Sequence, residues 1–75
     1  MTPPIELDNR GLEPPEPMTR ILEALERLPE GGTLVAHNDR RPMFLYPLLQ
    51  ERDFVCDTED LPDGSARLTI RRKPG

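Results

Sequence analysis

The segment from Glu16 to Leu28 constrains the fold most, because its apolar residues recur at the spacing of an α-helix. Five apolar side chains fall on one stripe of such a helix: Met18, Ile21, Leu22, Leu25 and Leu28. Charged residues occupy the opposite face, and Pro29 and Gly31-Gly32 end the helix. An apolar stripe of this width has to be buried against a second layer. The sequence therefore predicts an amphipathic helix that packs on a sheet or on another helix.

Two segments with strand patterns flank this helix. Ile5 to Asp8 alternates apolar and polar residues, the period of a half-buried strand, and Thr33 to Asn38 is short and β-rich. A strand, a helix and a strand in succession normally form a right-handed parallel unit. We expect the two strands to be parallel neighbours.

The second half of the chain predicts one more helix. Met43 to Arg52 has a helical composition, although Pro47 lies within it. Proline is tolerated in the first turn of a helix, where its missing N–H would have no partner. We therefore expect this helix to start near Phe44.

Two further strands follow, Phe54 to Asp57 and Ala66 to Arg71, with Leu68 and Ile70 facing inward. The turn sequence Leu61–Gly64 between them predicts a hairpin. The whole order is β-α-β-α-β-β, which predicts an α+β fold: a two-layer α/β sandwich with a four-stranded mixed sheet and both helices on one face. The other sheet face would be open to water. Residues 1–75 would form a single domain.

Composition narrows the class of protein. The chain has 75 residues, a formal net charge of -4 and one cysteine, Cys56. An acidic balance opposes nucleic-acid binding, and a lone cysteine fits a reducing compartment. No apolar run approaches the roughly 20 residues of a membrane span, and the first residues lack the pattern of a signal peptide. We expect a bacterial-type cytoplasmic monomer that binds neither nucleic acid nor membrane.

Residues 7–17 read Leu-Asp-Asn-Arg-Gly-Leu-Glu-Pro-Pro-Glu-Pro. This segment resembles the signature of the TusA/SirA sulfur-carrier superfamily, Leu-Asp-x-Arg-Gly-Leu-x-Cys-Pro-x-Pro. Every fixed position is met except one, because Pro14 stands where the family has the cysteine that carries sulfur. The resemblance thus supports the fold and opposes the best-known activity of that fold.

The resemblance continues from about Glu6 to Arg72. Gly32–Ala36 looks like the second strand of the family, Asn38-Asp39 takes the place of its acidic pair, and Pro47 matches a proline in its second helix. The chain is most similar to a branch of unknown function that lacks the carrier cysteine. This resemblance implies a non-catalytic module.

Polar residues follow the first two predicted strands, where the carboxyl ends of parallel strands and the helix starts share one edge of the sheet. We predict a ligand or partner edge from these residues: Asp8, Arg10, Glu16, His37, Asn38, Asp39, Arg40 and Arg41. Asn9 and Glu13 come to the same edge.

A divalent metal is one ligand that this edge could take. His37 and Asp39, with Asp8 and Glu16, would supply nitrogen and oxygen donors of the kind that iron, zinc or manganese accepts. A single histidine is thin support, because such sites normally use two or more. The alternative is that the two aspartates cap turns or helices and that His37 is a surface residue at a strand end.

An anion is the second possibility, using Arg10, Arg40 and Arg41 beside the helix starts. Against it, three prolines remove N–H donors from the first helix start, and Glu13 and Glu16 repel anions. We favour a structural role for Arg10, paired with Asp8, Glu13 or Glu16.

Catalysis has little support, because the sequence has no activated serine or cysteine motif. Cys56 lies on the predicted third strand, away from the position of the family cysteine, and is expected to be a small buried or half-buried residue. We expect neither an enzyme nor a sulfur carrier.

A protein partner remains, and it would bind the open sheet face together with Met43, Phe44 and Tyr46. The alternative is that these three side chains only pack the second helix on the sheet. The sequence thus favours a protein-interaction or regulatory module whose partner is another protein or a redox-linked domain. A metal- or small-ligand-binding domain at His37 and Asp39 comes second, and a sulfur-transfer protein comes third.

Overall fold

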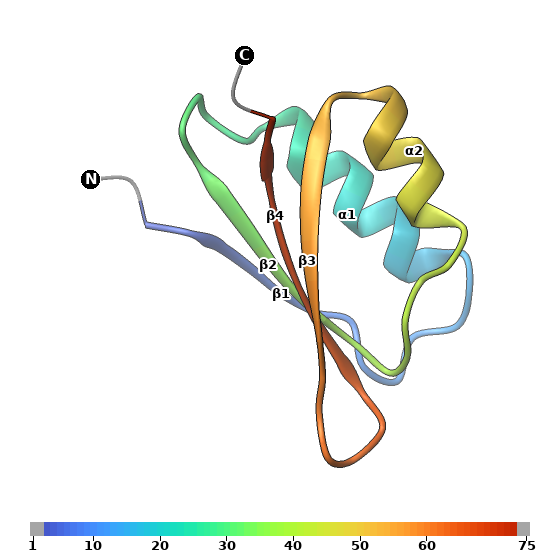
Figure 1. The fold of residues 1–75 in the computed structure, drawn as a ribbon. Coiled ribbons are helices and arrows are strands. Elements are labelled where there is room, and N and C mark those ends of the chain that lie inside the picture. The colour runs from blue at the N-terminus through green and yellow to red at the C-terminus, as the bar shows by residue number, and fades with distance from the viewer. Residues whose placement is uncertain (1–2, 74–75) are drawn as a thin grey trace.

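The computed structural model describes residues 3–73 and has the predicted order of elements (Figure 1). The elements are β1 Ile5–Asp8, α1 Glu16–Glu26, β2 Thr33–Asn38, α2 Leu45–Glu51, β3 Phe54–Asp60 and β4 Ala66–Arg72. The four strands form one mixed sheet in the order β1-β2-β4-β3, and both helices cover the same face of it. The α+β two-layer sandwich is therefore confirmed.

Strand pairing follows from the connections. β1 is parallel to β2, with Ile5 opposite Leu34 and Asp8 opposite His37, and α1 makes the crossover between them. β3 and β4 form the expected antiparallel hairpin, and β4 also pairs with β2 in antiparallel fashion. The long final hairpin thus places its second strand in the middle of the sheet.

The core lies between the helices and the inward face of the sheet. Its buried members are Ile21, Ala24, Leu25, Leu28, Leu34, Ala36, Leu45, Leu49, Phe54, Leu68 and Ile70. The apolar stripe of α1 and alternate residues of β2 and β4 supply most of this layer, as the two periodicities of helix and strand require.

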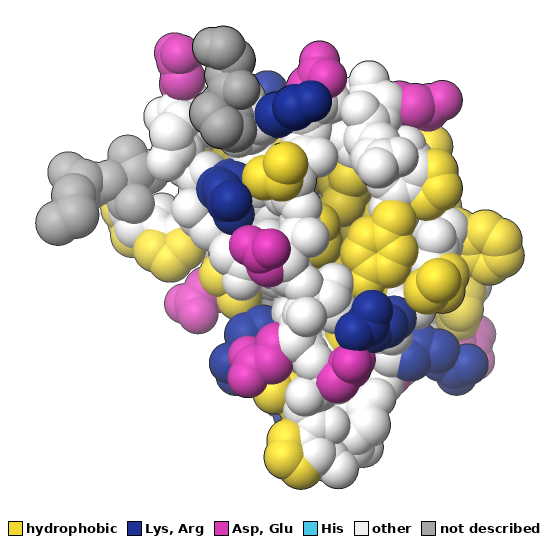
Figure 2. Space-filling view, viewed as in Figure 1, with side chains coloured by type: hydrophobic (Ala, Val, Ile, Leu, Met, Phe, Trp, Pro, Cys, Tyr) yellow, Lys and Arg dark blue, Asp and Glu magenta, His cyan; other side chains and the backbone are white. Residues whose placement is uncertain are grey.

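The outward face of the sheet carries charged cross-strand pairs. Arg67 contacts Glu59 at 3.3 Å and Arg71 contacts Asp57 at 3.1 Å, each between β4 and β3. Figure 2 shows acidic and basic side chains interspersed on this side, and hydrophobic side chains gathered over α2 and the loop before it. The open face therefore has the character of a solvated surface.

Element ends differ from the predicted ones by a few residues. α1 stops at Glu26, two residues before the end of its apolar stripe, because the Leu28 N–H turns back to the carbonyl of Leu25 ahead of Pro29. β3 runs to Asp60 because it pairs with β4 along its whole length. No helix within residues 3–73 is long and apolar enough to cross a membrane.

Candidate functional site

The alternation of strand side chains divides the predicted edge into two groups. Successive residues of a strand point to opposite faces, so Asp8 and the adjacent His37 lie on the outward face. Asn9 and Asn38, one residue further on, lie on the helix side and are buried. The sequence brings all of these residues to one edge, but the pleat of the sheet separates them.

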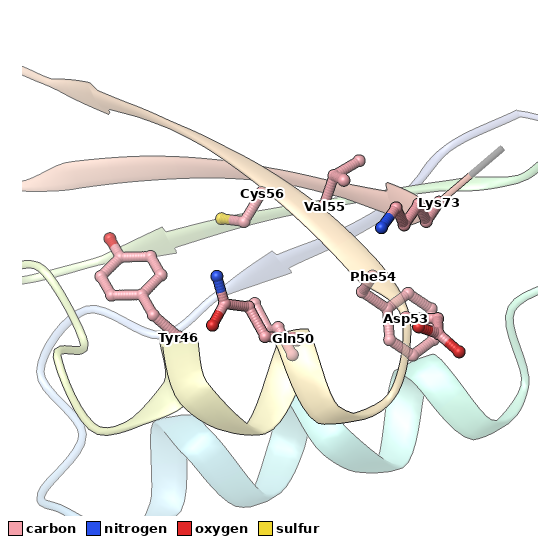
Figure 3. A pocket seen from close by; sticks show the side chains of 8 residues that line it. Tyr46, Gln50, Asp53, Phe54, Val55, Cys56 and Lys73 are labelled. Carbon is pink, nitrogen blue, oxygen red and sulfur yellow. The ribbon is translucent and has the colours of Figure 1, made fainter.

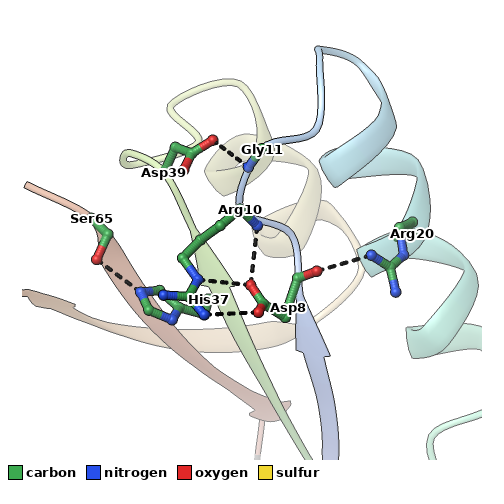
Figure 4. A network of polar contacts seen from close by, with 7 residues as sticks. All are labelled: Asp8, Arg10, Gly11, Arg20, His37, Asp39 and Ser65. Carbon is green, nitrogen blue, oxygen red and sulfur yellow. Dashed lines mark hydrogen bonds and ion pairs between the residues drawn. The ribbon is translucent and has the colours of Figure 1, made fainter.

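The outward group contains an ion pair that holds the first crossover. Arg10 donates from Nε and Nη2 to the two carboxylate oxygens of Asp8, at 2.9 and 2.8 Å (Figure 4). These bonds hold the pKa of Asp8 far below its usual range and raise the pKa of Arg10. Arg20 of α1 donates to the Asp8 carbonyl at 3.1 Å and ties the helix to the strand end. Arg10 therefore forms the expected ion pair, and of the three acids considered its partner is Asp8.

His37 belongs to a second network on the outward face. Its Nε2 lies 2.8 Å from Ser65 Oγ, and the Ser65 hydroxyl and N–H both donate to Asp63 Oδ1. Because the one hydroxyl proton of Ser65 goes to Asp63, His37 Nε2 is the donor to Ser65 Oγ. This direction is the opposite of the one that would activate a serine nucleophile. The network closes the β3–β4 turn against β2.

Asp39 joins the two crossover loops. Its Oδ2 accepts the Gly11 N–H at 2.8 Å, and Gly11 has a φ of +80°, a conformation that favours glycine (Figure 4). His37 and Asp39 therefore each have a hydrogen-bond partner of their own. Among residues 3–73 no group of three or more His, Cys, Asp and Glu side chains is placed to hold a metal ion. A metal at His37 and Asp39 stays a prediction.

A groove of about 480 Å³ opens between the two crossover loops. One wall comes from the β1–α1 loop and the start of α1: Leu12, Pro14, Pro15, Pro17 and Met18. The other wall comes from the β2–α2 loop and the start of α2: Asp39, Arg40, Arg41, Pro42, Met43, Phe44 and Leu45. Most of these side chains are apolar, and prolines offer no N–H donors. Pro14, which stands where the similar TusA/SirA signature has its cysteine, is therefore part of an apolar wall.

The rim of the groove carries two exposed apolar side chains. Phe44 is 86% exposed and Met43 is 65% exposed, whereas the adjacent Leu45 is fully buried. Tyr46 instead packs against the core and its hydroxyl lies 2.7 Å from Thr58 Oγ1. Packing of the second helix thus accounts for Tyr46 but not for Met43 and Phe44.

The charged residues at the groove differ in how they are paired. Arg41 makes two bonds to Asp60, at 2.8 and 2.7 Å, which lower the pKa of Asp60 and raise that of Arg41. Arg40, exposed on the same wall, has no ion-pair partner within residues 3–73. Glu16, the first residue of α1, is likewise exposed and without an ion pair in that range. Arg40 is therefore the cation that the groove can offer to a ligand.

Two asparagines also line the groove. Asn9 Nδ2 donates to Asn38 Oδ1 at 3.0 Å and to the Pro17 carbonyl at 3.4 Å, and Asn9 is fully buried. Sequence reasoning brought Asn9 to this edge but did not single it out. The pairing of the two asparagines could have been inferred from the parallel register, because Asp8 lies beside His37 and the next residues are Asn9 and Asn38.

Cys56 lines a different hollow, of about 540 Å³, between α2 and the edge strand β3. Its side chain points toward Tyr46 and Gln50 (Figure 3), and burial raises the pKa of its thiol. The residue is half-buried, as expected, and lies away from the wall that contains Pro14. A raised pKa disfavours the thiolate that sulfur chemistry needs.

Acid is expected to destabilise the protein through Asp8, Asp60 and Asp63. Arg10, Arg41 and Ser65 respectively lower the folded-state pKa of these carboxyls below the ordinary value of 3.8. A lowered folded pKa adds stability above the unfolded pKa, and this stability is lost as the pH falls toward the folded value. Urea unfolding at a series of pH values from about 6 downward measures the effect. Asp60→Asn should reduce the loss below about pH 4, and an unchanged pH dependence in this variant would contradict the assignment.

Comparison with known proteins agrees with the fold. No curated protein matches the chain. The structure is similar to the crystal structure of a SirA-like protein from Desulfitobacterium hafniense, with a TM-score of 0.81 and 22% sequence identity over 93% of this chain and 99% of that chain. This likeness confirms the SirA/TusA-like fold. Residues 6–72 match the model of the uncharacterized conserved protein family DUF2249, and the chain belongs to that family.

Proposed function

We propose that this chain is a protein-binding module that holds an apolar side chain of a partner protein in the groove between its two crossover loops. The observation that carries the proposal is Phe44, which is 86% exposed at the rim while its neighbour Leu45 is fully buried. Burying a phenylalanine side chain is worth about 1.5–3 kcal/mol. Folding leaves this gain unused at Phe44, so it is available for binding.

Charge indicates the chemistry of the partner. Arg40 projects from the same wall as Phe44 and has no ion-pair partner within residues 3–73. The net charge of the chain is -4, which repels a partner that is acidic overall. Arg40 attracts a carboxylate locally, so a single Asp or Glu of the partner can pair with it. We therefore commit to a segment that has an apolar side chain for the groove and a neighbouring Asp or Glu for Arg40. A metal at His37 and Asp39 rests on the donor types alone and is the second candidate.

Site-specific photo-crosslinking in the native cell tests this proposal. A benzophenone amino acid replaces Phe44 in one sample and Thr69, on the outward face of β4, in the control. We expect the Phe44 position to give an adduct whose crosslinked peptide contains an apolar residue beside Asp or Glu, and the Thr69 position not to give it. Arg40→Glu should reduce the adduct by about ten-fold, the effect of roughly 1.4 kcal/mol at an interface charge.

Three results would contradict the proposal. The first is that the same adducts form at the Phe44 and Thr69 positions. The second is that the crosslinked peptide lacks an acidic residue and that Arg40→Glu reduces the adduct no more than an unrelated charge change does. The third is that the adduct joins two copies of this chain. Mass spectrometry of the adduct separates these results, because it identifies both the crosslinked protein and the peptide.

A further inference from the structure

β3 forms one edge of the sheet, and its outer side has no strand partner within residues 3–73. Just before β3, the Asp53 carbonyl accepts the Lys73 N–H at 2.7 Å. Just after it, the Leu61 N–H donates to the Ser65 carbonyl at 2.9 Å. Along an antiparallel strand, backbone groups point alternately to one side and to the other, and the register of β3 with β4 is continuous. The odd-numbered residues therefore bond to β4. The N–H and C=O groups on the free side belong to Phe54, Cys56, Thr58 and Asp60.

This edge lacks most of the usual protection of an edge strand. β3 has seven residues, no proline and no bulge. The opposite edge strand, β1, has four residues and follows Pro3 and Pro4. Short strands, prolines and bulges prevent another chain from adding to a sheet. The free backbone groups of β3 can therefore pair with an extended segment.

The hollow of about 540 Å³ between α2 and β3 follows this edge (Figure 3). Val55 and Cys56 point to opposite faces of the sheet, yet both line the hollow. On the helix side, Tyr46, Leu49 and Phe54 give it an apolar lining. A strand added beside β3 would place every second side chain over this lining. Those side chains should be apolar.

The side chains between them would lie on the outward face, beside two acids of β3. Asp57 bonds through one carboxylate oxygen to Arg71 of β4 and is 78% exposed. Glu59 bonds through one oxygen to Arg67 of β4 and is 64% exposed. Each carboxylate has a second oxygen that can accept from another cation. The two arginines lie one strand further from the free edge, so an added strand meets the acids first.

The charges at the ends of β3 are balanced. Lys73 and Asp53 both line the hollow at one end, and Asp60 is paired with Arg41 at the other. A second copy of the chain is disfavoured, because full antiparallel overlap of two β3 strands places Asp57 opposite its own copy. The outward acids thus favour a basic segment.

We propose that β3 accepts an extended segment of a partner protein as an added antiparallel strand. In this segment, apolar residues over the hollow alternate with lysine or arginine on the outward face. The surface is separate from the groove between the crossover loops, so the inference does not depend on the proposed function.

Titration of the ¹⁵N-labelled protein with the peptide Lys-Val-Lys-Val-Lys-Val-Lys tests the inference. The amide hydrogens of Cys56 and Thr58 should exchange about ten-fold more slowly when about nine-tenths of the protein is bound, because they gain hydrogen bonds. The Asp57 amide already bonds to β4 and should be protected before and after. A peptide with glutamate in place of lysine should bind about ten-fold more weakly.

Two N-methylated forms of the lysine peptide test the backbone pairing. A valine opposite Cys56 in an antiparallel strand directs its N–H toward β3, whereas the neighbouring lysines direct theirs away. Two N-methyl valines should therefore weaken binding about ten-fold relative to two N-methyl lysines. In the protein, Asp57→Asn should weaken binding about three-fold. Glu26→Gln, which removes the same charge from the exposed side of α1, should not.

Four results would overturn the inference. The first is that no β3 amide signal moves at about 1 mM peptide, enough to half-saturate a site with that dissociation constant. The second is that the glutamate peptide binds as well as the lysine peptide. The third is that the N-methyl valine peptide binds no more weakly than the N-methyl lysine peptide. The fourth is that exchange at Cys56 slows with protein concentration alone, which would assign the edge to a second copy of the chain.

Discussion

Leu45→Ala is expected to lower the free energy of unfolding by about 2–5 kcal/mol, whereas Phe44→Ala is expected to change it by less than about 0.5 kcal/mol. The two residues are adjacent, yet Leu45 is fully buried in the core and Phe44 is 86% exposed. A domain of this size has roughly 3–5 kcal/mol of net stability, so the Leu45 variant should be largely unfolded in water. Urea denaturation followed by far-UV circular dichroism measures both values.

This pair of variants also bears on function. A small effect of Phe44→Ala would establish that the exposed ring does not contribute to folding, as the proposed binding role requires. A loss of more than about 1 kcal/mol in that variant would mean that the ring is packed in solution, and the argument from Phe44 would fail. The Leu45 variant serves as the internal control, because the same truncation is made one residue further along the chain.

Gly32→Asn is expected to destabilise the protein by about 1–3 kcal/mol, and Gly31→Asn by less than about 1 kcal/mol. A Cβ at Gly32 would lie 2.9 Å from the Pro29 carbonyl oxygen and 3.1 Å from its ring, in the turn that ends α1. At Gly31 an added Cβ would have no atom within 4 Å. The φ of Gly31 is +78°, and asparagine adopts that conformation more readily than most residues with a side chain.

The comparison is sharp because one substitution is made at two neighbouring glycines. Thermal unfolding of both variants under the same conditions gives the order directly. If Gly31→Asn is the more damaging change, the backbone conformation matters more at this turn than the contact with Pro29.

Much of the fold was predictable because it depends on local periodicity. The buried face of α1 follows from the apolar stripe between Met18 and Leu28, and that of β4 follows from the alternation in Ala66–Arg71. The order strand, helix, strand predicts a right-handed crossover. Residues such as Leu68 and Ile70 were therefore assigned to the core correctly. Element ends were less predictable, because hydrogen bonds at α1 and the long pairing of β3 with β4 decide them.

The candidate site was predictable only as an edge of the sheet. The sequence brought Asp8, Arg10, His37 and Asp39 to that edge, but it did not show which of them would pair with one another. Arg10 could have joined any of three acids, and the loop geometry selected Asp8. The partner of His37 is Ser65, which follows it by 28 residues and comes from a different turn.

By itself, the sequence determined the order of elements, the apolar faces and the presence of a proline, Pro14, at the start of the first crossover, because each depends on residue type and spacing along the chain. Only the tertiary structure decided that Asn9 is buried beside Asn38, that an apolar groove lies between the two crossovers, and that Phe44 remains exposed on its rim. These features depend on how two loops that are far apart in the chain pack against each other. Local pattern carries no information about that packing, since the contacts form only when the parallel strands bring both loops to the same edge.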